Sequence, residues 1–586
     1  MNSNDNRNFM LFAVLAVLLL VGWPALYSRI FPPANPPVTK IENGKSKPLP
    51  NPNAPVATSA AATRDRDMVL RESAGQRVRI QTPALSGSIN LKGARIDDLV
   101  LTQYKDTIAK DSPAIRLLSP EGTPDAYFGE FGWFGDGVAV PGPDTVFTTG
   151  DSVLAPGKPV TLDWTNPAGV RYRVRIAIDD HYMFTVDQLV GNGSAAPIRL
   201  RPYALVSRVG LTKDLQSATN HVGPIGVFNG GVDYGISYDN LKGNETSFLS
   251  KIWNGSGNPG ENHFDTTGGW TGFGDKYWLT ALIPGQSTQV RSGFPKANDD
   301  HFQADVSPSQ PATVNAGRGT GTRTLFFAGA KEVNTIDKYE DDYKIAHFGR
   351  AIDWGWFEII EKPIFKYLDW LFRNIGNFGV AIMCLTLTIR LLIFPIAQRQ
   401  FASMAQMRAV QPKMKAIQEK YKDDKARQQQ EVMALYKAEG VNPLAGCLPT
   451  LIQIPIMFSL YKVLILTIEM RHQPFAGWIR DLSAPDPATV LNLFGTLHFT
   501  PPGFLAIGVF PILLGVSMWL QFKMNPAPMD EAQKQVFAFM PWVLMFVMAP
   551  FAVGLQLYWI TSNLLTVLQQ KILYARHPVL KEAVAK

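Results

Sequence analysis

The stretch that decides the fold is Gly376–Ala397, which reads GNFGVAIMCLTLTIRLLIFPIA. As a helix, an apolar run of roughly 20 residues spans the ~30 Å hydrocarbon core of a bilayer. Arg390 lies well inside this run, where a guanidinium costs about 2.5–3.5 kcal/mol. Either the side chain reaches the cytoplasmic headgroups, or it faces a water-filled cavity within the membrane. Thr386 lies four residues earlier on the same helical face, which favours the cavity.

The composition indicates a membrane protein with one large water-exposed part. The chain has 586 residues and a net charge of +7. Its basic residues cluster beside apolar runs, which suits the positive-inside rule better than nucleic-acid binding. Both cysteines, Cys384 and Cys447, lie in apolar runs, so disulfides do not hold the water-exposed part together. The eight histidines lack metal-ligand spacing, and we expect neither a metal nor a cofactor.

The first 67 residues are predicted to be an anchor followed by a linker. Phe9–Tyr27 is long for the core of a signal peptide, and no small-residue cleavage site follows it. Residues 1–30 are therefore predicted to form an uncleaved signal-anchor helix with a cytoplasmic N-terminus. Residues 31–67 are rich in Pro, Ala, Asn and Ser, a composition typical of a linker.

Residues 68–342 are predicted to form an all-β domain. In Arg171–Ile178, RYRVRIAI, arginines alternate with other, mostly apolar, residues, and a period of two is typical of a strand with one buried face. Turn signals recur at short intervals without a long helical pattern, which favours a sandwich or a large open sheet structure. Gly317–Thr322, GRGTGT, lacks the spacing and the following helix of a nucleotide-binding loop.

Two segments that flank the quoted stretch are predicted to be amphipathic helices. Residues 343–374 combine aromatic and basic residues, as in a helix that lies in the headgroup plane. A soluble helix that caps the β domain is the alternative, and Pro363 is expected to break either helix into two pieces. Residues 398–440 are polar and basic, and their apolar spacing predicts two short helices paired as a cytoplasmic antiparallel hairpin.

Further apolar runs follow the hairpin, at residues 444–467, 504–522, 536–549 and 553–574. Residues 375–575 are therefore predicted to hold five membrane helices, and the anchor makes six. Counted from a cytoplasmic N-terminus, six spans place the β domain outside the cytoplasm. The same count places the hairpin and the basic tail, residues 576–586, inside it, where basic residues are expected.

Polar side chains recur within the predicted spans. Gln453 interrupts one span, and the last span carries Gln556, Trp559, Asn563, Thr566 and Gln570 at helical spacing. Each polar group needs a partner, because hydrocarbon offers none. Interhelical hydrogen bonds are one explanation, and a polar cavity shared with Arg390 is the other, which we favour. No nucleophile–base pair and no phosphate loop appears here, so we expect no enzyme activity.

Several long motifs resemble one family. Ala438–Tyr461, AEGVNPLAGCLPTLIQIPIMFSLY, resembles the signature of the YidC-type membrane protein insertases, the bacterial branch of the YidC/Oxa/Alb family. MRAVQPKMKAIQEKY and EVMALYKAEG resemble the cytoplasmic hairpin of that family, and LTLTIR and GLQLYWITSNLLTVLQQ resemble its second and sixth spans. The resemblance is close over Trp354–Ala575. The anchor, linker and β domain match the Gram-negative form in layout more than in residues.

The resemblance implies a five-helix core around a groove that is open to the cytoplasm and to lipid but closed on the far side. It also implies a periplasmic β super-sandwich. Arg390 occupies the position of the groove arginine of the family, and Tyr558-Trp559 stands where some members have Tyr-Tyr. We predict that the residues in contact with substrate are Arg390, Thr386, Gln453, Gln556, Trp559, Asn563 and Thr566.

The function and the partners follow from the same resemblance. A YidC-type protein inserts nascent proteins into the bacterial inner membrane and helps them to fold, with or without the Sec translocon and its accessory subunits. The implied partners are nascent membrane proteins, the ribosome and the phospholipid bilayer, without a specific nucleic-acid sequence. A solute transporter is one alternative, although its usual internal repeats are missing. A membrane-anchored periplasmic carbohydrate-binding protein is the other.

Overall fold

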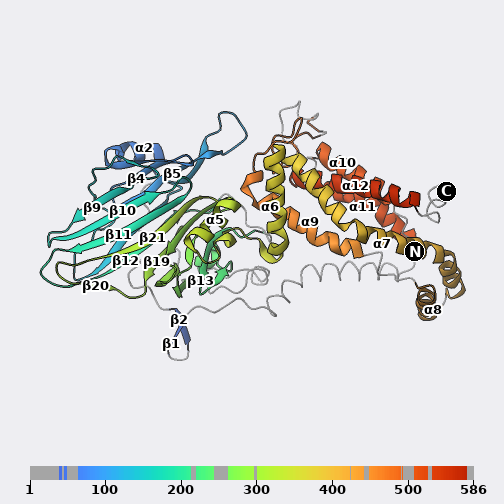
Figure 1. Ribbon diagram of the computed structural model, residues 1–586, viewed down its shortest axis with the longest axis horizontal. Helices are drawn as coiled ribbons and strands as arrows, with labels where there is room; N and C mark the ends of the chain where they lie inside the picture. The colour runs from blue at the N-terminus through green and yellow to red at the C-terminus, as the bar shows by residue number, and fades with distance from the viewer. Residues whose placement is uncertain are drawn as a thin grey trace. The chain divides into compact units, whose positions relative to one another are not determined.

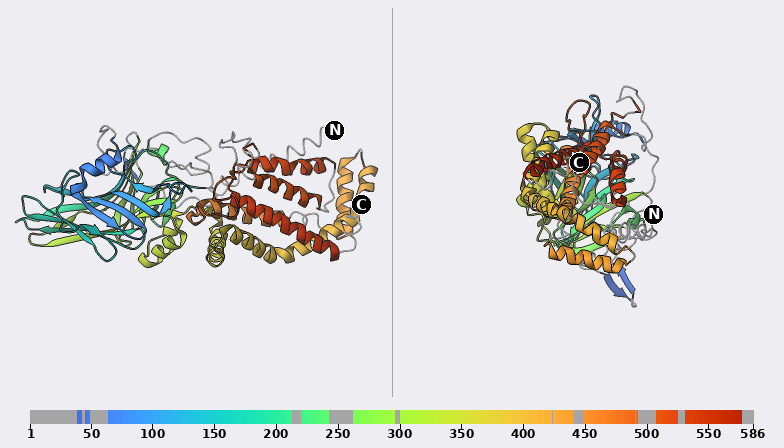
Figure 2. Two further views of the ribbon diagram at one scale, coloured as in Figure 1. Left: turned by 90° about the horizontal axis from the view of Figure 1, so that it is seen from above. Right: turned by 90° about the vertical axis from the view of Figure 1, so that its right-hand side faces the viewer.

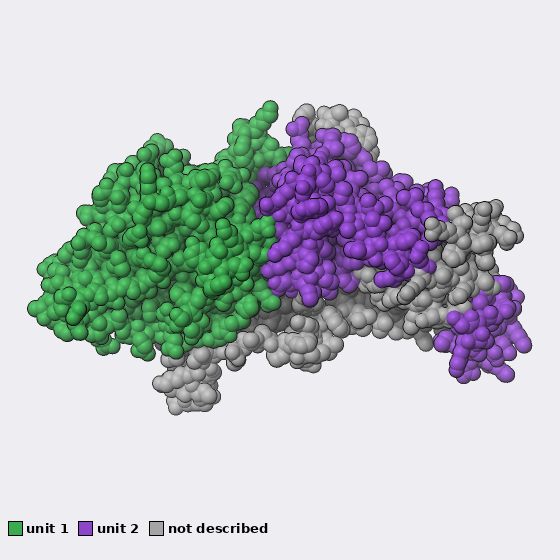
Figure 3. Space-filling view, viewed as in Figure 1, with its two compact units in different colours: residues 1–353 green, residues 354–586 purple. Residues whose placement is uncertain are grey.

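The computed structural model describes most of the chain, namely residues 39–42, 45–48, 64–212, 220–242, 262–295, 300–422, 424–440, 448–489, 491–492, 507–524 and 531–576. The expected anchor, most of the expected linker and nearly all of the expected basic tail lie outside these residues. Within the linker, β1 (Thr39–Glu42) pairs antiparallel with β2 (Lys45–Pro48). The chain divides into two compact units, Met1–Asp353 and Trp354–Lys586 (Figure 3). Strands dominate the first unit and helices the second (Figure 1).

The first unit contains two large sheets in its described part. The smaller sheet has eight strands, in the order β14 (Gly231–Asp233), β13 (Gly223–Phe228), β16 (Trp270–Gly274), β17 (Trp278–Pro284), β21 (Gly319–Ala330), β11 (Met183–Asn192), β10 (Val170–Ile178) and β9 (Val160–Thr165). All neighbours in it are antiparallel.

The larger sheet has eleven strands. Nine of them follow in the order β15 (Asn262–Thr267), β18 (Gln289–Phe294), β19 (His301–Pro308), β12 (Ile198–Val209), β7 (Tyr127–Asp136), β5 (Arg95–Lys105), β4 (Leu85–Asn90), β3 (Arg77–Gln81) and β8 (Val153–Leu154). The other two, β20 (Ala312–Val314) and β6 (Ala114–Leu118), pair with β12 and β5. Only the pairing of β3 with β8 is parallel within the described strands of this sheet.

The two sheets pack face to face and enclose the core of the first unit (Figure 2). Aromatic rings meet between the sheets: the ring centroids of Phe131 and Phe326 are 5.9 Å apart, and those of Trp133 and Tyr172 are 5.2 Å apart. The amide of Gln188 crosses the interface and donates to the carbonyl oxygen of Gly132 at 2.7 Å. The predicted sandwich is therefore confirmed.

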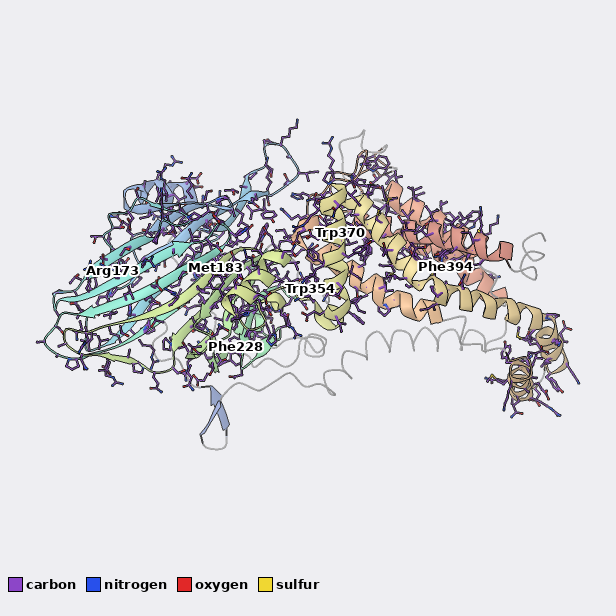
Figure 4. The ribbon with its side chains drawn as sticks, in the orientation of Figure 1. Arg173, Met183, Phe228, Trp354, Trp370 and Phe394 are labelled. Carbon is purple, nitrogen blue, oxygen red and sulfur yellow. The ribbon has the colours of Figure 1, made fainter. Side chains whose placement is uncertain are left out.

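The strand that predicted this domain is present. Strand β10 contains Arg171–Ile178, and its side chains alternate between a buried face and a solvent-facing face, where Arg173 lies (Figure 4). The glycine-rich segment from Gly317 leads into β21 and not into a helix. Small helices accompany the strands, at α2 (Arg66–Glu72) and α3 (Tyr238–Leu241).

The end of the first unit differs from the predicted boundary. Residue 342 was expected to end the β domain, but α5 (Val333–Tyr343) packs on β21, with the rings of Tyr339 and Phe327 5.9 Å apart. A 3₁₀ turn, η2 (Phe348–Ala351), continues this packing through Phe348, and the compact unit ends at Asp353. Burial of these aromatic rings ties the segment after residue 342 to the sheet.

The second unit is helical. Its helices are α6 (Glu358–Ile375), α7 (Phe378–Lys420), α8 (Lys425–Ala438), α9 (Leu448–Leu466), α10 (Val509–Lys523), α11 (Glu531–Met548) and α12 (Val553–Arg576). Short 3₁₀ turns, η3 (Gly355–Phe357) and η5 (Ile468–Met470), lie beside them. Helix α12 packs on α7 and α10, and α6 packs on α7 and α9 (Figure 2).

One helical stretch in the described chain, Phe378–Gln398, is long and apolar enough to cross a membrane by length and composition. Shorter apolar stretches lie in α9, α10 and α11. The four predicted runs that follow the hairpin coincide with α9 to α12. The count of six spans stays a prediction, since the expected anchor lies outside the described residues.

Two helix predictions are wrong in detail. The first arm of the 398–440 hairpin is not a separate short helix, because α7 continues from the apolar span through Pro395 and Pro412 to Lys420. The two arms do contact each other, since Lys413 Nζ bonds Glu439 Oε1 at 2.6 Å. Pro363 does not divide α6, which continues through it from Glu358 to Ile375.

Candidate functional site

Both ends of the α6–α7 connection are fixed by local sequence. Gly376 ends α6 in the left-handed conformation, with φ of 76°, and its N–H donates to the Phe372 carbonyl. Asn377 caps α7 by accepting the Val380 N–H at 3.1 Å, and its amide donates to the Phe475 carbonyl at 2.8 Å. Arg390 follows about 18 Å further along the helix axis, at about 1.5 Å per residue. The position lies within the apolar stretch Phe378–Gln398.

The guanidinium of Arg390 bonds a hydroxyl on the neighbouring helix. Arg390 Nε donates to Ser562 Oγ of α12 at 3.1 Å, and Arg390 Nη2 donates to the same oxygen. Gln569 Nε2, two turns further along α12, donates to the Arg390 carbonyl at 3.4 Å. In the described part of the chain, no carboxylate oxygen lies within 4.0 Å of this guanidinium. Its positive charge is therefore held by a neutral partner.

A second polar pair joins α12 to α10. Asn563 Nδ2 donates to Ser517 Oγ at 3.0 Å, and both side chains are buried. An amide–hydroxyl bond of this kind fixes the rotation of one helix against its neighbour. Asn563 thus points toward α10, whereas Ser562 points toward α7.

Two further predicted site residues are buried in this structure. Thr386 Oγ1 donates to the Ile382 carbonyl of its own helix at 2.7 Å, and the side chain is 1% exposed. The amide of Gln556 donates to the carbonyls of Met548 and Phe551 at 2.8 and 2.9 Å, and so closes the turn between α11 and α12. Contact of either residue with a substrate stays a prediction.

The remaining predicted site residues lie on or near the same helices. Trp559 and Thr566 are half-buried on α12. Thr566 Oγ1 donates to the Ser562 carbonyl at 2.7 Å, so its hydroxyl lies one turn from the Arg390 partner. Gln453 belongs to α9, but its side chain lies outside the described residues.

Sequence reasoning missed Ser562, Ser517 and Gln569. A signal for Ser562 and Gln569 was available, since they lie at helical spacing from Trp559 and Thr566 within the quoted motif of the last span. Ser517 had no such signal, because a single serine in an apolar run is compatible with a bond to its own helix. Its pairing depends on how α10 and α12 meet.

A compact loop closes one end of the helices. Asp486 is its centre: the carboxylate accepts from Trp478 Nε1 at 3.0 Å and from the Phe510 N–H, at the start of α10, at 2.8 Å. The carbonyls of Leu482 and Ala484 accept the first N–H groups of α12, each at 2.9 Å. These bonds satisfy helix N-termini that would otherwise be unpaired.

Helix α6 presents large apolar side chains outward. Ile359 is 84% exposed and Trp370 is 57% exposed, and Trp370 stacks on Tyr367 (Figure 4). Tyr367 Oη and Thr388 Oγ1 are 2.9 Å apart, which joins α6 to α7 close to Arg390 in the sequence. Exposed Trp and Tyr rings beside polar groups are typical of a membrane interface.

The fold and the site define a helical membrane protein with buried polar pairs between its helices and a β-sandwich domain. Residues 370–581 match the family described as 60Kd inner membrane protein, and residues 77–367 match the YidC periplasmic domain. The chain is 44% identical to the membrane protein insertase YidC of Zymomonas mobilis over 99% of this chain and 97% of that protein. It is also 44% identical to the membrane protein insertase YidC of Methylorubrum extorquens over 98% of this chain and 96% of that protein.

A solved structure, an active YidC insertase with its first transmembrane domain resolved, covers 95% of this chain and 98% of that chain at 17% identity, with a TM-score of 0.35. From the sequence matches, the chain belongs to the YidC family of membrane protein insertases. It is an inner-membrane protein with a periplasmic β domain. The family is one of insertases and not a known class of enzyme, and the matches favour neither a transporter nor a carbohydrate-binding protein.

Proposed function

We propose that this protein takes nascent inner-membrane proteins from the cytoplasm into a polar groove beside Arg390 and releases them into the bilayer as they fold. The observation that carries the proposal is the contact of Arg390, at intramembrane depth, with a neutral hydroxyl. A buried charge normally finds a compensating charge or shifts toward its neutral form, and arginine cannot lose its proton. A guanidinium without such compensation suits an incoming acidic segment.

The groove would lower the barrier to moving a polar segment across the membrane. Polar backbone and charged side chains are costly in hydrocarbon, and a water-filled groove shortens the apolar path that they must cross. Once the apolar segment reaches lipid, its transfer supplies about 25 cal/mol per Å² of buried apolar surface. Insertion then needs no nucleotide, although the membrane potential contributes where the segment is charged.

The proposed contact residues fall into two groups. Arg390, Trp559 and Thr566 have exposed surface and would contact the substrate first. Thr386, Gln556 and Asn563 are buried, so they would contact it only after α7, α10 or α12 move apart. Gln453 on α9 is proposed as a further contact because it is a polar residue within an apolar span.

The route into lipid would follow α9 and α11. The outward side chains of α11 are large and apolar, as at Phe539, Val543 and Phe546, and Ile454 is exposed on α9. Apolar surface on a membrane helix is solvated by lipid, and a substrate helix can replace that lipid. The exposed rings of α6 would lie at the membrane interface.

Partners and topology complete the proposal. The ribosome and the Sec translocon with its accessory subunits are proposed partners, and the basic α7–α8 hairpin would face the ribosome. Six spans, with both termini in the cytoplasm, would place the β domain in the periplasm. The proposed divisions are an anchor at 1–30, a linker at 31–67, an interfacial helix within 343–374, a core at 375–575 and a cytoplasmic tail at 576–586.

The test is photocrosslinking from α12 to ribosome-bound nascent membrane proteins of increasing length. A photoreactive side chain at Trp559 probes the polar face, and the same side chain at Leu564, which is exposed on α12, probes lipid. We expect Trp559 crosslinks when a transmembrane segment leaves the ribosome and their loss on release. Equal crosslinking from both positions at every length would contradict the groove.

A further inference from the structure

The hydroxyl of Ser562 is hydrogen-bonded to the charged end of Arg390. Two guanidinium N–H groups, on Nε and Nη2, converge on its single hydroxyl oxygen. A hydroxyl has two lone pairs, so this contact saturates Ser562 Oγ as an acceptor. The guanidinium carries further N–H groups on Nη1 and Nη2, which point away from this shared oxygen.

Ser562 is held rigidly, so it can fix the direction of Arg390. It is 2% exposed, and its carbonyl accepts the Thr566 hydroxyl one turn later. The next residue, Asn563, is bonded to Ser517 of α10, which sets the rotation of α12. Gln569 then reaches the Arg390 carbonyl from the same side of α12 as Ser562. Three bonds thus orient the α12 face that meets Arg390.

The chemistry of the partner decides what the guanidinium can still bind. A carboxylate at position 562 would form a charge-assisted pair with Arg390 and compensate its charge. A hydroxyl holds the same N–H groups by weaker bonds and leaves the charge in place. An incoming carboxylate can therefore displace the hydroxyl, whereas it could not readily displace a second carboxylate.

We propose that Ser562 is a positioning residue that sets the preference for acidic segments, because it orients Arg390 without compensating its charge. The inference rests on the proposed function of Arg390 and adds the residue that keeps that charge available. The partner that would recognise the site is an acidic stretch of a translocated polypeptide segment.

The experiment compares Ser562→Asp with Ser562→Asn in the full chain in membranes. Insertion rates are measured for two substrates that differ only in acidic or neutral residues of the translocated segment, and the ratio of the rates is the readout. The two variants are nearly equal in size and differ in charge. We expect Ser562→Asp to bring the ratio down to that of Arg390→Ala and Ser562→Asn to keep it close to the unaltered protein.

A second pair of Ser562 variants keeps the test decisive if Ser562→Asp fails to fold. Ser562→Thr keeps the hydroxyl, and Ser562→Ala removes it. The matched control is Thr561→Ala, since Thr561 Oγ1 donates to the Leu557 carbonyl of its own helix at 2.8 Å. We expect Ser562→Ala to lower the ratio, and Ser562→Thr and Thr561→Ala to preserve it. Protein in the membrane is quantified for each variant.

The outcomes separate the two claims. If Arg390→Ala leaves the ratio unchanged, the proposed role of Arg390 fails. If Arg390→Ala lowers the ratio but Ser562→Asp and Ser562→Asn change it equally, or not at all, then Ser562 does not act through charge and the inference is overturned.

Discussion

The β domain and the helical unit hold buried and half-buried arginines in different ways. In the β domain, Arg208 Nη1 bonds Asp275 Oδ1 at 2.8 Å, and Arg77 forms a two-point pair with Asp97 at 2.7 and 3.0 Å. Arg95 bonds both Glu130, at 2.6 Å, and Glu121. In the helical unit, Arg390 bonds a serine. Compensated charge stabilises a fold, whereas charge with a neutral partner remains available for binding.

The energetic reason lies in desolvation. Removal of a charge from water costs several kcal/mol, and a nearby opposite charge with good hydrogen bonds offsets this cost. The arginines of the β domain meet this condition, because their partner carboxylates are held on other strands and turns of the sandwich. Arg390 has a hydrogen-bond partner but no carboxylate within 4.0 Å among the described residues, and this difference supports the proposal that substrate binds to the helical unit.

The largest expected effect is on the stability of the β domain. Arg208→Ala leaves Asp275 buried without its partner, so we expect a loss of about 3–5 kcal/mol in the free energy of unfolding. The measurement is thermal unfolding of the solubilised full chain. Arg323→Ala is the control, because Arg323 is exposed beside Asp187 and such pairs contribute about 0.2–1 kcal/mol. Equal losses from both variants would show that the buried pair stabilises the β domain no more than the exposed pair does.

The next effect is on insertion. Arg390→Ala should slow insertion of substrates with acidic translocated segments by about tenfold, which corresponds to about 1.4 kcal/mol. The reason is that the attraction between opposite charges is stronger where the local dielectric is low. Substrates with neutral segments should be slowed less. Arg390→Lys should be intermediate, since an ammonium keeps the charge but lacks the planar fork that bonds Ser562 twice. Equal slowing of both substrates would contradict an electrostatic role.

The third effect is a dependence on pH that we expect for the stability of the β domain but not for insertion. Burial lowers the pKa of His221, and Lys331 acts in the same direction, against the Pro224 carbonyl and Asp353. The folded domain thus keeps this imidazole neutral, whereas the unfolded chain takes up a proton below about pH 6.5. The free energy of unfolding should therefore fall as pH drops from 7 to 5, by about 1.4 kcal/mol per unit of pKa lowering.

His221→Gln should reduce this pH dependence, as measured by unfolding of the β domain in the full chain at a series of pH values. The acidic-to-neutral insertion ratio should stay constant between pH 6 and 8, because the Arg390 guanidinium remains charged. A ratio that followed the stability of the β domain would show that the two regions are coupled.

The smallest effect concerns packing in the membrane. Asn563→Ala and Ser517→Ala each remove one interhelical hydrogen bond, and such bonds contribute about 0.6 kcal/mol on average. A double-mutant cycle in lipid bicelles should give a coupling energy of that order. A coupling energy as large as that of a buried ion pair would show that the polar pair of the helical unit stabilises the fold as much as the ion pairs of the β domain do.

The sequence was informative wherever a local pattern repeats over one element. The alternation in Arg171–Ile178 predicted β10, and the apolar runs predicted α9 to α12. It misjudged elements whose ends depend on distant contacts. Packing of Phe348 on Phe327 extends the first unit beyond residue 342, and α7 continues to Lys420 although the chain becomes polar from Gln398.

The sequence by itself determined that Arg390 lies within a membrane span, because hydrophobicity and length are properties of one segment. Only the tertiary structure decided its partner. Ser562 is far from Arg390 in the chain, and a serine in a membrane helix can bond its own backbone as readily as a neighbour. Asn563, the next residue, bonds Ser517 of α10, since adjacent residues on α12 point to different helices. The direction of each side chain follows from helix packing, which a linear pattern does not contain.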